Sequence, residues 1–296
     1  MMKIFRVVKR GYYISYAILE NNIVIRLDED PVRALIRYSE NKEVLGDKVV
    51  GLDYELLLKN FQVNDVKITK PIDPLEVWGS GISYEMARER YSEENVAKIL
   101  GKTIYDTVYD AVRPEIFFKA TPNRCVGHGE AIAVRSDSEW TLPEPELAVV
   151  IDSNGKILGY TIMDDVSARD LEAENPLYLP QSKIYAGCCA FGPFIVTPDE
   201  VKNPYNLDIK LRILREGKVF YEGSVNTSKM RRKIEEQIEY IIRDNPIPDG
   251  TILTTGTAIV PGRDKGLKHR DVVEISISSL GTLITPVIKH EKEDKI

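Results

Sequence analysis

The chain has 296 residues, of which 43% are hydrophobic and 29% charged, and its formal net charge is -6. This composition is that of an ordinary globular protein, long enough for one large domain with a small one beside it. The acidic balance gives no basic footprint for nucleic acid, and no apolar stretch reaches the roughly 20 residues that cross a membrane.

The first 74 residues predict a small α+β domain. Strands are expected at residues 4–8, 13–19 and 23–27. Pro31 opens a helix, because proline is favoured at the first helical position, and a second short helix is expected at residues 54–58. Pro71 and Pro74 disfavour continuous structure. We therefore divide the chain into residues 1–74 and a larger domain of residues 75–296.

The larger domain begins with a strand over residues 77–82, where Gly79 and Gly81 would let a ligand approach the backbone. A charged helix is predicted over residues 84–100. Arg88 on this helix carries the planar donor fork that binds carboxylates, so it is a candidate for substrate binding. A solvated helix face is the alternative interpretation.

Two further residues are candidates for proton transfer. A buried strand is predicted over residues 113–119, and Glu115 within it would have its pKa raised toward use as an acid or base if it is buried. Lys183 lies in a long polar loop predicted over residues 172–184, and loops of that length are often functional. A lysine near an anionic site could bind substrate or transfer a proton, whereas a solvated lysine is the alternative.

The centre of the chain predicts a β-hairpin. Runs of β-forming residues at 147–151 and 157–162 flank residues 152–155, Asp-Ser-Asn-Gly, which are a strong turn signal. A turn centred between Asn154 and Gly155 would place Glu144 directly opposite residue 165. Both strands read as apolar throughout, which is typical of strands buried on two faces.

Three carboxylates converge on one face of this hairpin. Glu144 and Glu146 share a strand face, and Asp165 lies opposite Glu144, at a Cβ separation of about 4.5–5.5 Å. Asp164 then points away. A bulge or an odd-length turn would exchange the two aspartates.

A buried cluster of carboxylates requires a cation, and an all-oxygen ligand set favours Mg²⁺, with Mn²⁺ or Ca²⁺ as alternatives, over zinc. We therefore predict a divalent metal bound by Glu144, Glu146 and Asp165. The competing interpretation is a solvated Glu-x-Glu strand, which the apolar flanks make less favourable.

The rest of the chain predicts β structure with one amphipathic helix. A hairpin about Glu216-Gly217, and strands at residues 252–257, 273–277 and 283–288, are expected, and Ser228 is a candidate cap for the helix around Ile234. The three cysteines are too few and wrongly spaced for a zinc site and are expected to be small buried residues. The first residues lack a signal-peptide core, so a cytoplasmic location is expected.

Several segments together resemble the fumarylacetoacetate hydrolase superfamily over roughly residues 76–290. They are Glu144-Pro145-Glu146-Leu147-Ala148, Gly159-Tyr160-Thr161, Asp165-Val166-Ser167-Ala168-Arg169-Asp170, Gln181-Ser182-Lys183, Phe191-Gly192-Pro193 and Thr255-Gly256-Thr257. Residues 113–119, 138–140 and 174–180 are similar to the branch of dehydratases that act on 2-keto-3-deoxy sugar acids.

The resemblance implies a β-rich α+β fold, a small N-terminal domain followed by a mixed β-sandwich roll. It also implies Mg²⁺ on Glu144, Glu146 and Asp165, substrate contacts from Lys183 and Thr257, and a homo-oligomer, a tetramer built from two dimers. Hydrolytic members of the superfamily carry a histidine at the position of Ala87. Its absence here disfavours hydrolysis, since no other side chain is an evident base for activating water.

The expected reaction is therefore dehydration of a 2-keto-3-deoxy pentonate, a small sugar acid, to 2,5-dioxopentanoate. A metal would hold the developing enolate charge, Lys183 and Glu115 would transfer protons, and Thr257 and Arg88 would bind the substrate carboxylate. Two alternatives stay open: an acylpyruvate hydrolase or oxaloacetate-type decarboxylase with the same metal chemistry, and a non-catalytic oligomer that binds sugar acids.

Overall fold

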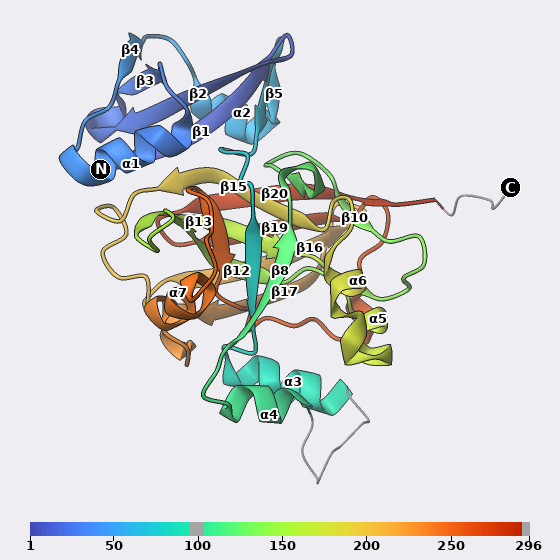
Figure 1. Ribbon diagram of the computed structural model, residues 1–296. Helices are drawn as coiled ribbons and strands as arrows, with labels where there is room; N and C mark the ends of the chain where they lie inside the picture. The colour runs from blue at the N-terminus through green and yellow to red at the C-terminus, as the bar shows by residue number, and fades with distance from the viewer. Residues whose placement is uncertain (95–103, 292–296) are drawn as a thin grey trace, which may run out of the picture.

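The computed structural model describes residues 1–94 and 104–291, and these form a β-rich α+β fold with few helices, as the sequence predicts. Figure 1 shows the first six strands and two helices as a layer above a larger body of stacked sheets, with helices at its periphery. Within the described residues, no helix is both long enough and apolar enough to cross a membrane.

The N-terminal unit forms as predicted. Its elements are β1 (Met2–Lys9), β2 (Tyr12–Leu19), η1 (Glu20–Asn22), β3 (Val24–Leu27), α1 (Pro31–Asn41), β4 (Gly46–Val49), α2 (Tyr54–Asn60), β5 (Gln62–Val63) and β6 (Val66–Thr69). Asp30 caps α1 by accepting a hydrogen bond from the Val32 N–H at 2.9 Å. Because β1 pairs with β15 at Lys3 and Ile4, this unit shares one continuous sheet with the rest of the chain, and its status as a separate domain stays a prediction.

Three sheets organise the strands. The largest has the strand order β4-β3-β2-β1-β15-β13-β12-β18-β7-β8, with β5, β6 and β9 joined at its side. Its strands beyond residue 70 are β7 (Val77–Gly81), β8 (Glu115–Ala120), β9 (Cys125–Val126), β12 (Pro145–Ile151), β13 (Ile157–Asp165), β15 (Cys189–Val196) and β18 (Thr251–Thr254). A second sheet contains β10 (Ile132–Val134), β16 (Asp208–Arg215), β17 (Lys218–Asn226), β19 (Val272–Ile277) and β20 (Gly281–Lys289), and a third pairs β11 (Thr141–Leu142) with β14 (Ser167–Ala168).

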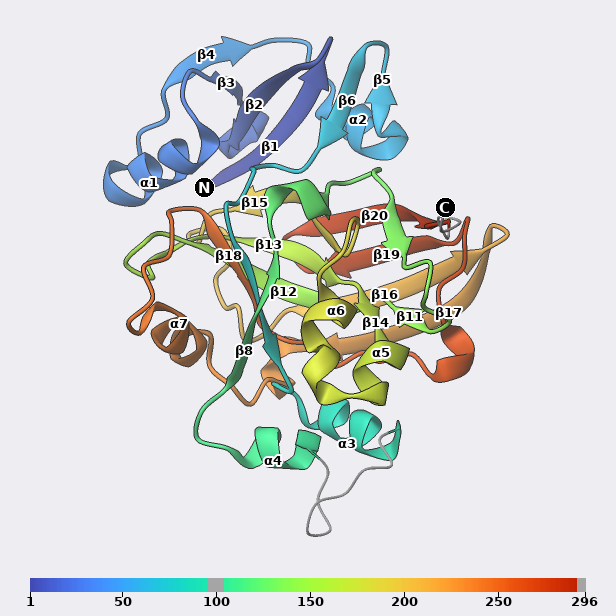
Figure 2. The same cartoon turned by 45° about the vertical axis from the view of Figure 1, so that its right-hand side comes forward.

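The central hairpin is buried on both faces because it lies between two cores. Leu147 and Val149 pack in the same core as Leu211 of the second sheet. Ala148 and Val150 face the opposite core, which includes Leu35 of α1. Every residue of β12 is therefore buried, and the prediction that both faces of this hairpin are covered is confirmed. Figure 2 shows the second sheet packed against β12 and β13.

The remaining helices cover the periphery. They are α3 (Glu85–Glu94), α4 (Ile104–Asp110), η2 (Pro122–Arg124), α5 (Arg169–Glu174), η3 (Pro176–Tyr178), α6 (Leu179–Lys183), η4 (Thr227–Lys229), α7 (Ile234–Ile242) and η5 (Arg263–Lys265). The end of the predicted charged helix, residues 95–100, lies outside the described residues. All three cysteines are buried, as expected.

Two local predictions were wrong. The segment at residues 172–184 is not a loop, because most of it folds into α5, η3 and α6; two prolines lie at helix starts, where proline is tolerated. Ser228 does not cap α7. It lies in η4, where its N–H donates to the Asn226 side chain, and Lys233 precedes the first residue of α7.

Candidate metal centre

The hairpin brings Glu144 opposite Asp165, as predicted, although the loop that joins the two strands differs from the predicted turn. Pro145 pairs with Asp164, and the Asp165 N–H donates to the Glu144 carbonyl at 3.0 Å. The connecting loop spans residues 152–156 and is longer than the predicted turn, since Ile151 pairs with Ile157. An irregularity in the ladder directly after this pair shifts the register by one residue and so restores the predicted pairing at the acidic end.

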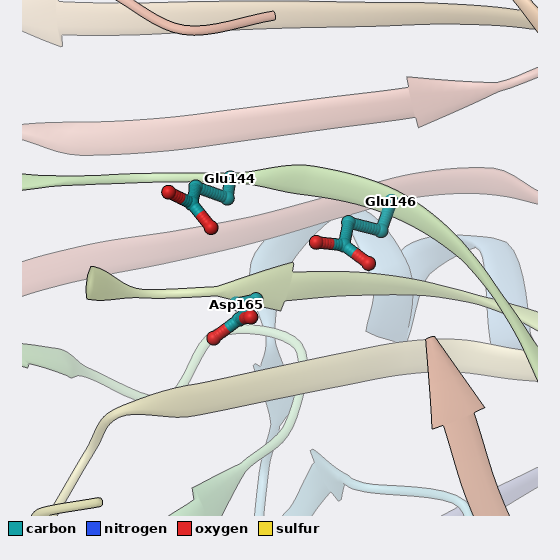
Figure 3. Close-up of side chains that lie close together, drawn as sticks. All are labelled: Glu144, Glu146 and Asp165. Carbon is teal, nitrogen blue, oxygen red and sulfur yellow. The ribbon is translucent and has the colours of Figure 1, made fainter. Parts of the chain in front are cut away.

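Glu144, Glu146 and Asp165 form a buried cluster. One carboxylate oxygen from each lies within 4.8 Å of the others, and each residue is at most 3% exposed. Figure 3 shows the two glutamates on one strand and the aspartate on its neighbour, with the three carboxylates directed into a shared space. Asp164 points away and accepts the Glu144 N–H at 2.9 Å.

Two buried lysines supply positive charge to this cluster. The Lys183 ammonium donates to Glu144 Oε2 at 2.7 Å, to Asp165 Oδ2 at 3.0 Å and to Ser167 Oγ at 2.6 Å. The Lys119 ammonium lies 2.6 Å from Asp165 Oδ1. The expectation that a buried carboxylate cluster needs a cation is therefore met partly by the chain's own side chains.

Asp165 and Glu146 differ in how firmly they hold a proton. Burial raises the pKa of Asp165, but Lys119 and Lys183 outweigh it, so this pKa lies below its ordinary value. Burial and the Asp165 charge raise the pKa of Glu146 well above its ordinary value. Glu146 therefore holds a proton more tightly than an ordinary carboxyl group.

The cluster fits a hard divalent cation. It offers only carboxylate oxygens, from residues that lie close together in a buried site, and Mg²⁺ prefers such oxygens over the nitrogen and sulfur ligands that favour zinc. A cation at this position would compete with the proton on Glu146 and with the Lys183 ammonium for the same oxygens.

Glu115 faces the same site from β8. Its carboxylate oxygen Oε2 would lie 2.0 Å from a Cβ added at Gly81, so only glycine leaves room for it there. Gly79 likewise leaves room for the Phe117 ring. The glycines predicted to admit a ligand thus admit side chains from the neighbouring strand. Burial and the nearby Glu172 charge raise the pKa of Glu115 to about 7.

A small cavity joins these groups. It has a volume of about 20 Å³ and is lined by the three carboxylates, Glu115, Lys183 and Thr257, and also by Ser80, Gly81, Ile82, Phe117, Arg169, Glu172 and Leu179. That volume is enough for about one water molecule. A second cavity of about 90 Å³ shares Glu115, Glu172 and Leu179 with the first. A five-carbon acid would need both cavities and movement of the side chains between them.

Arg88 is not brought to this cavity. Its guanidinium lies 3.3 Å from Glu85, 3.7 Å from Glu89 and 3.9 Å from Asp106 and stacks over the Tyr109 ring. Glu85 lies three residues before Arg88 on α3, a spacing that places both side chains on one helix face. The packing of α4 against α3 adds Asp106 and Tyr109. Its role in substrate binding stays a prediction that this placement does not favour.

Arg169 lines the cavity where Arg88 was expected. It is 2% exposed, and its guanidinium lies 2.5 Å from Glu172, which is three residues further along α5. The sequence did carry a signal for this pair, since an arginine and a glutamate three apart on a helix share one face, but the segment was interpreted as a loop from residue 172. Lys119 was also missed as a site residue. Its signal is a lysine at the end of an apolar strand that also carries Glu115.

Asp164→Asn should be much milder than Asp165→Asn. The amide oxygen that Asp164→Asn introduces can still accept the Glu144 N–H, whereas Asp165→Asn removes the charge that binds the cation and both lysines. We expect activity and Mg²⁺ affinity to fall by less than about tenfold for Asp164→Asn and by at least about 100-fold for Asp165→Asn. Kinetics and calorimetric Mg²⁺ titration would measure both, and equal losses would contradict the assignment.

Glu115→Gln should stabilise the metal-free protein at high pH and not at low pH. Because the pKa of Glu115 is raised to about 7 by folding, the folded state holds this proton more tightly than the unfolded state. Wild-type stability therefore falls as pH rises toward 7, and glutamine has no proton to lose. We expect a gain on the order of 1 kcal/mol near pH 8 that vanishes near pH 5, measured by thermal unfolding in EDTA. A gain that does not change with pH would contradict this.

The sheet order, the buried hairpin and its acidic triad define one family of metal-dependent proteins. The family profile described as "Fumarylacetoacetate (FAA) hydrolase C-terminal" matches residues 91–288. The chain belongs to the fumarylacetoacetate hydrolase family, and the resemblance seen in the sequence is confirmed.

Three similar proteins are dehydratases of 2-keto-3-deoxy sugar acids by name. A 2-dehydro-3-deoxy-D-arabinonate dehydratase of Saccharolobus solfataricus is 86% identical over 99% of this chain and 98% of its own. A probable 2-keto-3-deoxyxylonate dehydratase of Haloferax volcanii is 45% identical over 75% of each chain. The solved structure of 2-keto-3-deoxy-D-arabinonate dehydratase complexed with magnesium and 2,5-dioxopentanoate has a TM-score of 0.94 and 82% identity, covering 98% of this chain and 100% of the other.

Proposed function

We propose that the protein is a Mg²⁺-dependent dehydratase that converts 2-keto-3-deoxy-D-arabinonate to 2,5-dioxopentanoate in the oxidative breakdown of pentoses. The observation that carries the proposal is the buried triad of Glu144, Glu146 and Asp165. It is supported by 86% identity over nearly the whole chain to a dehydratase of this kind and by a relative's structure with magnesium and 2,5-dioxopentanoate.

The triad would hold Mg²⁺, which supplies a Lewis acid that stabilises negative charge developing on the keto acid. The Lys183 ammonium lies at the same end of the cavity, so it would donate hydrogen bonds to the oxygens of the acid. Thr257 lines the same cavity and would contact the substrate there. Arg169 offers a guanidinium in the position predicted for Arg88, with Glu172 as its partner.

Glu115 would transfer the protons. It borders both cavities, so it is placed near the middle of a bound substrate, and its pKa of about 7 lets it accept and donate a proton near neutrality. Glu115 would remove a C3 proton and return it to the departing C4 hydroxyl, which leaves as water. This elimination leaves a C3=C4 double bond conjugated to the C2 keto group. Loss of a C5 proton and protonation of C3 would then move the double bond to C4=C5, and the enol so formed tautomerises to the C5 aldehyde, so all five carbons stay in the product.

The products separate this proposal from its alternatives. Incubation with 2-keto-3-deoxy-D-arabinonate and Mg²⁺ should give a single five-carbon product, 2,5-dioxopentanoate, identified by mass. A shorter product would favour a hydrolase or decarboxylase. Saturable binding with no turnover would favour a sugar-acid-binding protein. Ala87 is buried and has no group that could activate water for cleavage.

We further propose that the chain assembles as a homotetramer built from two dimers, which the family resemblance supports. The sedimentation of the purified protein, run with and without Mg²⁺, would test this, and a monomer at micromolar concentration would contradict it. A cytoplasmic location belongs to the same proposal, and its support is a free sugar acid as substrate.

A further inference from the structure

Lys119 lies beside the metal-ligand cluster and is fully buried, with 0% of its surface exposed. Its ammonium lies 2.6 Å from Asp165 Oδ1. It also donates to the Val166 carbonyl at 2.9 Å and to the Lys183 carbonyl at 2.8 Å. The two carbonyls use two of the three N–H donors of the ammonium, and Asp165 Oδ1 lies beside it as an ion pair, so three oxygens surround the group.

The backbone of β8 is irregular at this residue. Trp78 of β7 pairs with Phe118, but the residue before it, Val77, pairs with Ala120, so Lys119 has no partner on β7. Lys119 is therefore the extra residue of a β-bulge. Bulges occur often beside active sites, where they re-aim a side chain. With Glu115 and Phe117, which line the cavity, Lys119 is the third residue that β8 directs to the site.

The contacts of Lys119 join two parts of the site that are separate in the chain. Asp165 is the last residue of β13, Val166 follows it, and the carbonyl of Lys183 is at the end of α6, the helix that carries the Lys183 ammonium. Lys119 pairs with Asp165 Oδ1, whereas Oδ2 accepts a hydrogen bond from Lys183 at 3.0 Å. The two lysines together set the orientation of the Asp165 carboxylate in the cluster.

We propose that Lys119 is a positioning residue for the metal centre. It fixes the orientation of the Asp165 carboxylate beside Glu144 and Glu146, and it fixes the end of α6 so that the Lys183 ammonium reaches the same cluster. The inference rests on the proposed function for its kinetic consequence, but its consequence for metal binding does not depend on which substrate is used.

A simple counter-ion at this position would behave in the opposite way. If Lys119 served only to neutralise Asp165, its removal would leave the carboxylate with less positive charge around it, and a divalent cation would bind more tightly in its place. If Lys119 positions Asp165, its removal frees the carboxylate to rotate and Mg²⁺ binds more weakly. The direction of the change in affinity thus separates the two roles.

The test compares Lys119→Met with a matched control, Lys70→Met. The Lys70 ammonium also pairs with two carbonyls and one carboxylate, those of Pro122, Cys125 and Asp73, but it contacts none of the proposed metal ligands. Each full-length variant is purified, stripped with EDTA and titrated with Mg²⁺ by calorimetry. Turnover of 2-keto-3-deoxy-D-arabinonate is then measured at saturating Mg²⁺.

We expect Lys119→Met to weaken Mg²⁺ binding by about 10–100-fold and to lower kcat by about tenfold or more, while Lys70→Met changes neither. Unchanged or tighter Mg²⁺ binding by Lys119→Met would overturn the inference. If circular dichroism shows that Lys119→Met does not fold, Lys119→Gln, which keeps two N–H donors, is judged by the same criteria. A wild-type protein that binds Mg²⁺ without turnover would refute the proposed function and leave the calorimetric comparison to decide the role of Lys119.

Discussion

Glu146→Gln is expected to remove Mg²⁺-dependent turnover while leaving the metal-free protein folded. In the absence of metal, burial and the Asp165 charge raise the pKa of Glu146 well above its ordinary value, so the neutral glutamine costs the buried site less than a charged side chain would. Its amide oxygen can still accept the Gly256 N–H, which donates to Glu146 Oε2 at 2.7 Å in the wild type.

The variant nevertheless cannot become an anionic ligand. Loss of this ligand weakens the binding of the Mg²⁺ that stabilises the developing negative charge. Removing one such electrostatic contribution costs about 100-fold or more in kcat, so we expect a loss of that size or larger, with weakened Mg²⁺ binding. Thermal unfolding in EDTA should match the wild type within a few degrees. If Glu146→Gln kept full Mg²⁺-dependent activity, Glu146 would not be a metal ligand.

Lys183→Met is expected to lose both activity and metal-free stability. The Lys183 ammonium pairs with Glu144 and Asp165 in a buried site, and methionine removes this positive charge from both carboxylates. Breaking a buried ion pair from one side costs about 3–5 kcal/mol, so unfolding in EDTA should shift to a markedly lower temperature. Mg²⁺ should restore part of this loss, because it supplies the missing positive charge.

Mg²⁺ should not restore the activity of Lys183→Met, even though it restores part of the variant's stability. The lost ammonium is the proposed donor to the substrate acid, and we expect kcat to fall by at least about 100-fold even at saturating Mg²⁺. The exposed Lys156, whose ammonium donates to Ser39, provides the control variant Lys156→Met. Recovery of full activity with Mg²⁺ would show that Lys183 is only a counter-ion.

The acidic triad was predictable because strand alternation is local and strict. Two glutamates two apart on one strand share a face whatever the rest of the chain does, and an apolar hairpin fixes which partner lies opposite them. The prediction of the pairing held even though the loop at residues 152–156 has odd length, since an irregularity further along the strands compensates for it. That compensation could not be predicted from the turn residues alone.

The groups around the triad were less predictable because they come from distant parts of the chain. Lys119 reaches Asp165 through a bulge that pairing with β7 creates, and no local sequence signal gives a strand partner. Arg169 could have been found from its spacing to Glu172 had residues 172–184 been interpreted as helical. Arg88 was chosen for its chemistry alone, but the folding of α4 against α3 pairs it with carboxylates outside the cavity.

The most direct test of the central claim is a Mg²⁺ titration of activity in the metal-stripped protein, with 2-keto-3-deoxy-D-arabinonate as substrate and the products followed by mass. The account predicts no turnover in EDTA and a saturable return of activity with added Mg²⁺, giving 2,5-dioxopentanoate as the product. Full turnover without any divalent cation, or a product with fewer than five carbons, would contradict it.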